Sequence, residues 1–132
     1  MKKAFTLLEL LLIVIIIGML ATFAIPQFVK IGEKALDNEA QGYLMTMLAG
    51  EKIFKSETDA FYPSTVHVDL NNNLDISLPP AGGKWNYSAK VYPASGTSPG
   101  TVCVQAERNS NTTRYWSMYD TDLDGPQTGQ CK

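Results

Sequence analysis

Hydrophobic and polar positions divide the chain near Pro26. From Phe5 to Ile25 the only polar side chains are Thr6, Glu9 and Thr22. As a helix, this stretch is about 31 Å long, enough to cross a bilayer core of about 30 Å. Beyond Pro26, polar and apolar residues mix as they do in a soluble protein. The pattern predicts a membrane-spanning segment followed by a folded domain in water.

Two lysines set the expected orientation of this segment. Lys2 and Lys3 precede the apolar run, and positive residues favour the cytoplasmic side of a membrane. The large domain is therefore expected outside the cytoplasm. A cleaved secretory signal peptide is the competing interpretation, but the run exceeds the usual apolar core of about 7 to 15 residues and contains Glu9.

A second helical pattern extends from Gln27 to Glu57. Apolar positions recur there at spacings near 3.6, which is typical of an amphipathic helix. They are Leu36, Ala40, Leu44, Met47 and Leu48, with Glu51 near the end. Charged residues fill the first half of the helix and are expected to meet solvent or other subunits. They are Lys30, Glu33, Lys34, Asp37 and Glu39. The apolar second half is expected to pack under a sheet.

Residues 56–80 are predicted to be a loop-rich connection. The breakers are Tyr62-Pro63, Asn71-Asn72-Asn73 and Pro79-Pro80. His67 lies alone in this stretch, and no nucleophile motif accompanies it. We interpret it as a surface or core histidine, and we expect a protein that is not an enzyme.

Three later segments alternate apolar and polar residues as strands do: 84–92, 101–108 and 114–119. The connections 95–100 and 109–111 suit hairpins. Val102, Val104 and Ala106 share one face of the middle strand, with Cys103 and Gln105 on the other. The expected fold class is α+β, a long helix packed on an antiparallel sheet of about three to four strands.

Composition narrows the function and the redox chemistry. The 132-residue chain has 11 Lys and Arg against 13 Asp and Glu, a net charge of -2, so no specific nucleic-acid partner is predicted. Cys103 and Cys131 are an even pair, which favours a disulfide in an exported domain. The alternative is two unrelated buried thiols. A zinc site is improbable because His67 is the only histidine.

Asp120, Asp122 and Asp124, followed by Gly125, have the D-x-D-x-D-G spacing of a calcium loop. The ligand set is incomplete, because Cys131 occupies the position of the bidentate Glu. We therefore treat the three aspartates as a candidate calcium site, with an acidic turn in solvent as the alternative.

Glu9 is costly where it stands. A carboxylate at membrane depth costs about 2.5 to 3.5 kcal/mol on insertion scales and marks a functional hypothesis by default. Near the start of the helix, Glu9 can reach the headgroups in the monomer, which makes the acid tolerable without explaining it. A partner cation would explain it, and a cut before Phe5 would create one.

The sequence around Glu9 resembles that of a known protein family. The run Ala4-Phe5-Thr6-Leu7-Leu8-Glu9, followed by a Leu/Ile stretch with Gly18 and Pro26, is similar to the class III leader and N-terminal helix of type IV pilins and the related pseudopilins. The family usually has Gly before the cut, and alanine is tolerated in some members. The resemblance implies a pilin fold, leader cleavage between Ala4 and Phe5, and N-methylation of Phe5.

The resemblance also implies roles for three further residues. Glu9 of one subunit neutralises the Phe5 amine of a neighbour and sets the register of the filament. The helix melts between Gly18 and Pro26 on assembly, with a static kink as the alternative. The resemblance further implies that a disulfide closes the C-terminal region. It also implies that some members of the family bind calcium near that end.

The implied organisation has three parts: leader 1–4, transmembrane and filament-core helix 5–26, and extracytoplasmic pilin domain 27–132. The precursor is expected in a bacterial inner membrane with its N-terminus in the cytoplasm, in contact with lipid. The implied partners are identical subunits in a helical filament, a prepilin peptidase and methyltransferase, and an inner-membrane assembly platform with a cytoplasmic ATPase.

The favoured function is a structural subunit of an extracellular type IV pilus, serving adhesion, motility or DNA uptake. The cysteine pair favours a pilin over the alternative, a major pseudopilin in a periplasmic filament of a type II secretion system. The aspartate cluster favours the pseudopilin. A third hypothesis is a membrane-anchored calcium-binding module that never polymerises.

Overall fold

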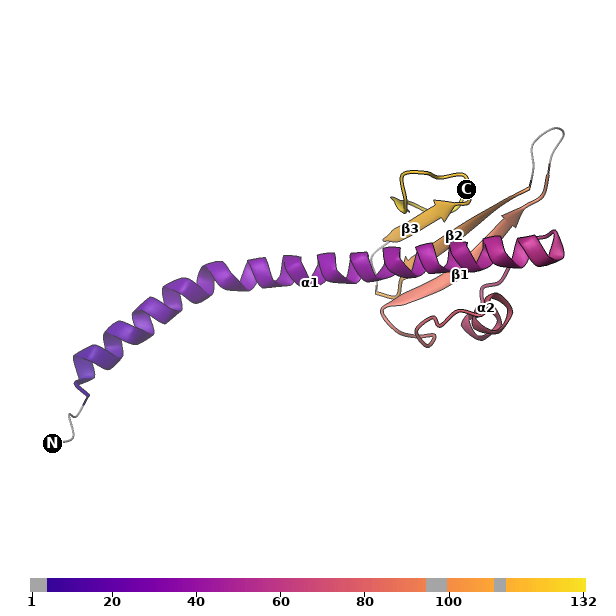
Figure 1. Ribbon diagram of the computed structural model, residues 1–132. Coiled ribbons are helices and arrows are strands. Elements are labelled where there is room, and N and C mark those ends of the chain that lie inside the picture. The colour runs from indigo at the N-terminus through magenta and orange to yellow at the C-terminus, as the bar shows by residue number, and fades with distance from the viewer. Residues whose placement is uncertain (1–4, 95–99, 111–113) are drawn as a thin grey trace. The chain divides into compact units, whose positions relative to one another are not determined.

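The computed structural model describes residues 5–94, 100–110 and 114–132. The leader 1–4, residues 95–99 of the first predicted hairpin connection and residue 111 of the second lie outside the described residues. The elements are α1 (Leu7–Thr58), α2 (His67–Leu74), β1 (Trp85–Tyr92), β2 (Thr101–Arg108), β3 (Tyr115–Tyr119) and β4 (Gln127–Thr128) (Figure 1). Contacts divide the chain into two compact units, which meet between Leu36 and Asp37. Each unit is described by itself.

The first unit is the N-terminal part of α1. Thr6 caps the helix, because its Oγ1 accepts the Glu9 N–H at 3.2 Å and a Ser or Thr at this position satisfies a backbone donor of the first turn. None of the described side chains up to Leu36 is buried. α1 is the one helix among the described residues that is long and apolar enough to cross a membrane.

The second unit contains a four-stranded antiparallel sheet in the order β1-β2-β3-β4. The three long strands lie within one residue of their predicted bounds. Val102, Val104 and Ala106 are fully buried on one face of β2, as their alternation with Cys103 and Gln105 predicted. The register places Val104 opposite both Ala89 of β1 and Met118 of β3.

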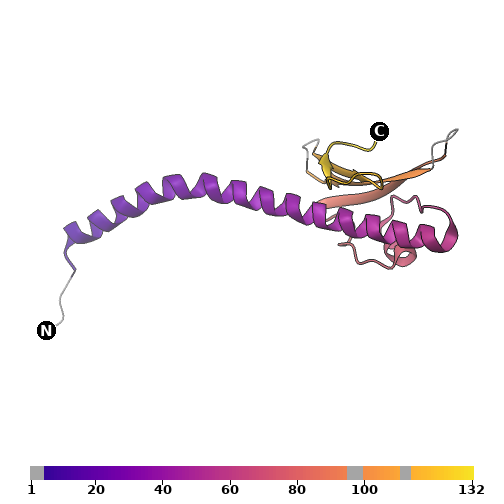
Figure 2. The same cartoon turned by 45° about the horizontal axis from the view of Figure 1, so that its top comes forward.

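The predicted amphipathic helix supplies the other half of the core. The part of α1 that belongs to this unit lies along one face of the sheet (Figure 2). Its buried apolar residues follow the predicted spacing: Ala40, Leu44, Met47 and Leu48. They pack with Trp85, Tyr87 and the β2 valines in one cluster. The second half of the predicted amphipathic helix and the α+β class are confirmed.

The helix α2 corrects the loop predicted for residues 56–80. Leu70 and Leu74, four residues apart, are both buried, and their burial outweighs the weak helix propensity of three consecutive asparagines. Asn71 reaches beyond the helix, where its Oδ1 accepts the Leu78 N–H at 2.8 Å. An asparagine that we interpreted as a breaker therefore fixes the segment that follows α2. His67 is a core histidine, 5% exposed.

A second correction concerns Asp37, which we expected to meet solvent or another subunit. Its side chain is instead buried. Its carboxylate accepts hydrogen bonds from the Arg114 guanidinium and, at 3.3 Å, from the Trp116 indole N–H. Asp37, the first residue of the second unit, is thereby joined to Trp116 of β3 and to Arg114, which precedes β3. The Arg114 cation compensates the charge of the buried carboxylate.

Glu51 is a fully buried carboxyl group on α1. Its Oε2 accepts the Tyr62 N–H at 2.9 Å, whereas Oε1 has no hydrogen-bond partner among the described residues. Burial raises the pKa of Glu51 to about 7, against a smaller lowering by the Tyr62 hydrogen bond. The Glu51 side chain therefore holds the chain after α1 at Tyr62. Removing its carboxyl group from water costs free energy.

The first prediction follows from this raised pKa. The pKa of Glu51 is higher in the folded state than its ordinary value of 4.5, so its contribution to stability is fully present below that value and is lost as the pH rises through 7. Glu51→Gln should remove this loss. Between pH 5 and 9, the wild type should lose about 3 kcal/mol of unfolding free energy relative to the variant.

Denaturant unfolding of the full chain in detergent micelles, followed by tryptophan near-UV circular dichroism, measures this difference. Glu57→Gln, at an exposed glutamate of the same helix, is the matched control and should keep the wild-type pH dependence. Parallel pH profiles for wild type and Glu51→Gln would contradict the prediction.

Candidate assembly helix and C-terminal disulfide region

The candidate assembly residues lie at the start of α1. Phe5 is 69% exposed. The Glu9 carboxylate is exposed and makes no hydrogen bond or ion pair with the residues that the structure describes. Its place in the first helical turn favours a negative charge, because the backbone N–H groups there carry partial positive charge. The spacing Thr6-x-x-Glu9 is also that of a capping box, a local signal that our interpretation of Glu9 had missed.

The surface of this helical segment is apolar on all sides. From Leu7 to Ile31, the large hydrophobic side chains are 42% to 82% exposed. A helix that is apolar all round is normally buried in a protein core or a membrane. Monomeric soluble proteins rarely expose a contiguous apolar surface that extends over several helical turns. The segment therefore requires a cover of lipid or of protein.

Gly18 and Pro26 both lie inside the continuous helix α1. Proline has no N–H, so position 26 cannot donate the helical hydrogen bond to the Thr22 carbonyl. The Thr22 hydroxyl donates to the Gly18 carbonyl at 2.9 Å, a bond that often accompanies helix bending. The melting predicted between Gly18 and Pro26 stays a prediction.

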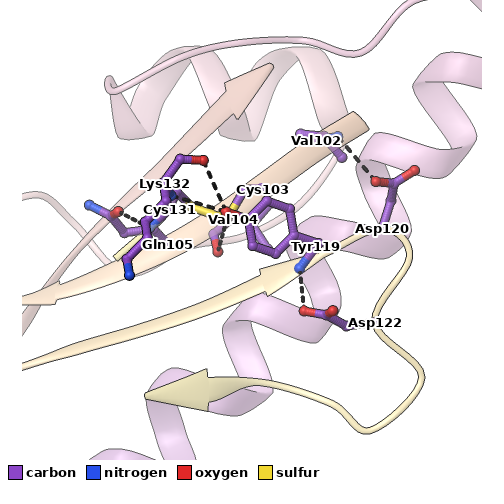
Figure 3. Close-up of a disulfide and its surroundings, with 9 residues drawn as sticks. All are labelled: Val102, Cys103, Val104, Gln105, Tyr119, Asp120, Asp122, Cys131 and Lys132. Carbon is purple, nitrogen blue, oxygen red and sulfur yellow. Dashed lines mark hydrogen bonds between the residues drawn. A yellow bond between two sulfur atoms is a disulfide. The ribbon is translucent and has the colours of Figure 1, made fainter. Parts of the chain in front are cut away.

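The predicted disulfide between Cys103 and Cys131 is present, and it ties the end of the chain to β2 (Figure 3). Both cysteines are buried, and the Cys131 N–H donates to Oε1 of Gln105 at 3.1 Å. Beside them, the Tyr119 hydroxyl donates to the Lys132 carbonyl and accepts the Lys132 N–H. One covalent bond and these three hydrogen bonds thus hold Cys131 and Lys132 on β2 and β3.

The aspartate cluster has a structural role in this region. Oδ1 of Asp120 accepts the Val102 N–H at 3.2 Å, and Oδ2 of Asp122 accepts the Tyr119 N–H at 2.9 Å (Figure 3). Asp124 is exposed. Within the described part of the chain, no three His, Cys, Asp or Glu side chains are grouped as metal ligands. Asp120 and Asp122 thus each engage a backbone donor, and calcium binding stays a prediction.

A long apolar N-terminal helix joined to a four-stranded antiparallel sheet is the α+β arrangement of the pilin type. The chain is 34% identical over 95 residues to the type IV major pilin protein PilA of Myxococcus xanthus. The alignment covers 72% of this chain and 39% of the relative, so the chain spans about two fifths of the relative's length. No family model and no solved structure matches significantly. The chain is therefore similar to a type IV major pilin over most of its length, and its fold is of the pilin type.

The second prediction concerns the disulfide. Replacing both cysteines with serine should lower the unfolding free energy by roughly 3 to 4 kcal/mol, because the bond closes a loop of 28 residues and restricts the unfolded chain. Denaturant unfolding of the full chain in micelles measures the loss. Reductant should destabilise the wild type and leave the double-serine variant unchanged. Equal stability of the two proteins under oxidising conditions would contradict the prediction.

Proposed function

We propose that this chain is a structural subunit of a type IV pilus and polymerises through the apolar part of α1. The observation that carries the proposal is the helical surface from Leu7 to Ile31, exposed on all sides with one carboxylate in its first turn. A membrane covers such a surface in the precursor, and neighbouring helices cover it in a filament. The similarity to a major pilin supports the same conclusion.

In the proposed mechanism, a peptidase cuts between Ala4 and Phe5. The new Phe5 amine, which is then methylated, remains cationic. Glu9 of an incoming subunit neutralises the Phe5 amine of a subunit already in the filament. An ion pair in an apolar bundle contributes alignment more than affinity, so the pair selects the register while the apolar surface provides cohesion.

The bend-prone stretch between Gly18 and Pro26 would allow the helix to unwind when it packs into the filament. Glycine is a weak helix former and proline removes a backbone donor, so unwinding there costs less than elsewhere in α1. We place the domain after this stretch outside the cytoplasm, with Lys2 and Lys3 inside.

Two alternative functions are considered beside the pilus subunit. A pseudopilin of a secretion system would use the same helix and the same pairing in a short periplasmic filament. A membrane-anchored calcium module would need Asp120, Asp122 and Asp124 to bind the ion. Two of these carboxylates already accept backbone N–H groups, which counts against the calcium module and leaves the pseudopilin alternative unaffected.

The third prediction tests the role of Glu9. Glu9→Gln should leave the precursor inserted and folded but reduce filament yield by at least about tenfold, because an unpaired cation at membrane depth costs several kcal/mol. Sheared-filament yield measures assembly, and membrane fractionation measures insertion. Glu57→Gln, an exposed change in the same helix, should assemble normally. Normal filament yield from Glu9→Gln would refute the pairing.

The fourth prediction concerns the mature N-terminus. Intact-mass and N-terminal peptide mass spectrometry of assembled protein should find methylated Phe5 as the first residue. This result would separate a filament subunit from a membrane-anchored module. An intact Met1, or a start at Ile25 after signal-peptide cleavage, would contradict the proposed function.

A further inference from the structure

His67 makes two hydrogen bonds that fix its protonation state. Its ring is buried, and Nδ1 lies 2.9 Å from the Pro79 carbonyl oxygen. Nε2 accepts the backbone N–H of Tyr87 at 2.9 Å. A carbonyl can only accept and a backbone N–H can only donate, so the proton belongs on Nδ1 and the lone pair on Nε2. The imidazole is neutral in this structure.

The bond to Tyr87 has a particular position in the sheet. In the strand order β1-β2-β3-β4, β1 is an edge strand, and its outer N–H groups belong to alternate residues. Tyr87 donates to His67, and Ala89 donates to the Ser64 carbonyl at 2.8 Å. An uncovered edge of this kind is a template for pairing with another strand. Residues 64–67 cover it, and His67 replaces the carbonyl acceptor of a neighbouring strand.

We propose that His67 is an acid-released latch that holds α2 and residues 64–67 over the edge of β1. Protonation of Nε2 turns the acceptor into a donor that faces the Tyr87 N–H. Two donors cannot bond, so the imidazolium leaves its site and takes the start of α2 with it. The outer N–H groups of β1 are then uncovered and open to exchange with water or to pairing with another strand.

The groups around His67 leave the imidazolium without a partner that would hold it in place. The ring of Tyr87 faces it from β1 with centroids 5.6 Å apart, and burial raises the pKa of that hydroxyl, which stays neutral. Tyr43 of α1 packs on Tyr87 in turn. On α2 itself, Asp69 is exposed to solvent. Among the described residues, no carboxylate forms an ion pair with His67.

Glu51, the other buried titratable group that anchors this part of the chain, acts in the opposite direction. Its raised pKa makes the ionised form the costly one, so acidification relieves the cost of burying Glu51. Loosening on acidification therefore cannot originate there. The two groups are distinguishable by the sign of their pH dependence.

Amide hydrogen exchange by NMR tests the latch on the isotopically labelled full chain in detergent micelles. Protection of the Tyr87 amide is compared at about pH 7.5 and pH 5, each corrected for the intrinsic exchange rate. The Val104 amide, in the central strand β2, is the internal reference. We expect Tyr87 protection to fall at least about tenfold relative to Val104 at the lower pH. Unchanged relative protection would overturn the proposal.

His67→Gln is the matched variant, because its amide oxygen accepts the Tyr87 N–H and does not titrate in this range. Its Tyr87 protection should be the same at both pH values. A variant that loses protection as the wild type does would overturn the proposal. If the variant does not fold, the imidazole ¹⁵N chemical shifts of wild-type His67 are followed as the pH is lowered. Protection of the Tyr87 amide must fall as His67 becomes protonated. Tyr87 protection that stays high after His67 is protonated would refute the latch.

Discussion

An apolar helical surface that its own unit leaves uncovered is the constraint on which the function of this chain depends. Each square ångström of apolar surface returned to water costs about 25 cal/mol, and the side chains from Leu7 to Ile31 are exposed all round. Lipid tails and the helices of identical subunits are equally apolar covers. In the proposed assembly, the exchange of one for the other therefore involves little hydrophobic free energy, and the few polar groups can decide the geometry. From Leu7 to Ile25, Glu9 is the charged group in this surface, and Lys30 follows near its end.

The domain after Leu36 is organised differently, because polar groups fix its segments to an apolar core. Asp37 joins α1 to β3 through Arg114 and Trp116. Glu51 holds the chain after α1 through Tyr62. The disulfide holds the C-terminal segment on β2. Each of these contacts joins residues well separated in the sequence, so each restricts how a segment lies on the sheet. The apolar core and the disulfide stabilise this unit, and the polar contacts also fix how each segment lies on the sheet.

The parts of the fold that the sequence predicted are those with a local periodic signal. Alternation marked Val102, Val104 and Ala106 as one face of β2, and a 3.6-residue period marked Leu44, Met47 and Leu48 as core. The even cysteine count predicted the disulfide.

The errors occurred where tertiary contacts decide. The asparagine triplet suggested a break, but the burial of Leu70 and Leu74 makes that stretch helical. Asp37 looked solvent-facing because its partner Arg114 is 77 residues away. The role of Glu9 depends on other copies of the chain, so the fold of one copy leaves it a proposal.

Two titratable side chains, Glu51 and His67, hold the connection between α1 and β1 in place. Glu51 holds its beginning and becomes costly as the pH rises through 7, because a fully buried carboxyl must then ionise. His67 holds its middle and requires a neutral ring, because Nε2 accepts the Tyr87 N–H. One anchor weakens in base and the other in acid. The two anchors therefore respond to pH with opposite signs, and the proposed opening on acidification starts at the histidine.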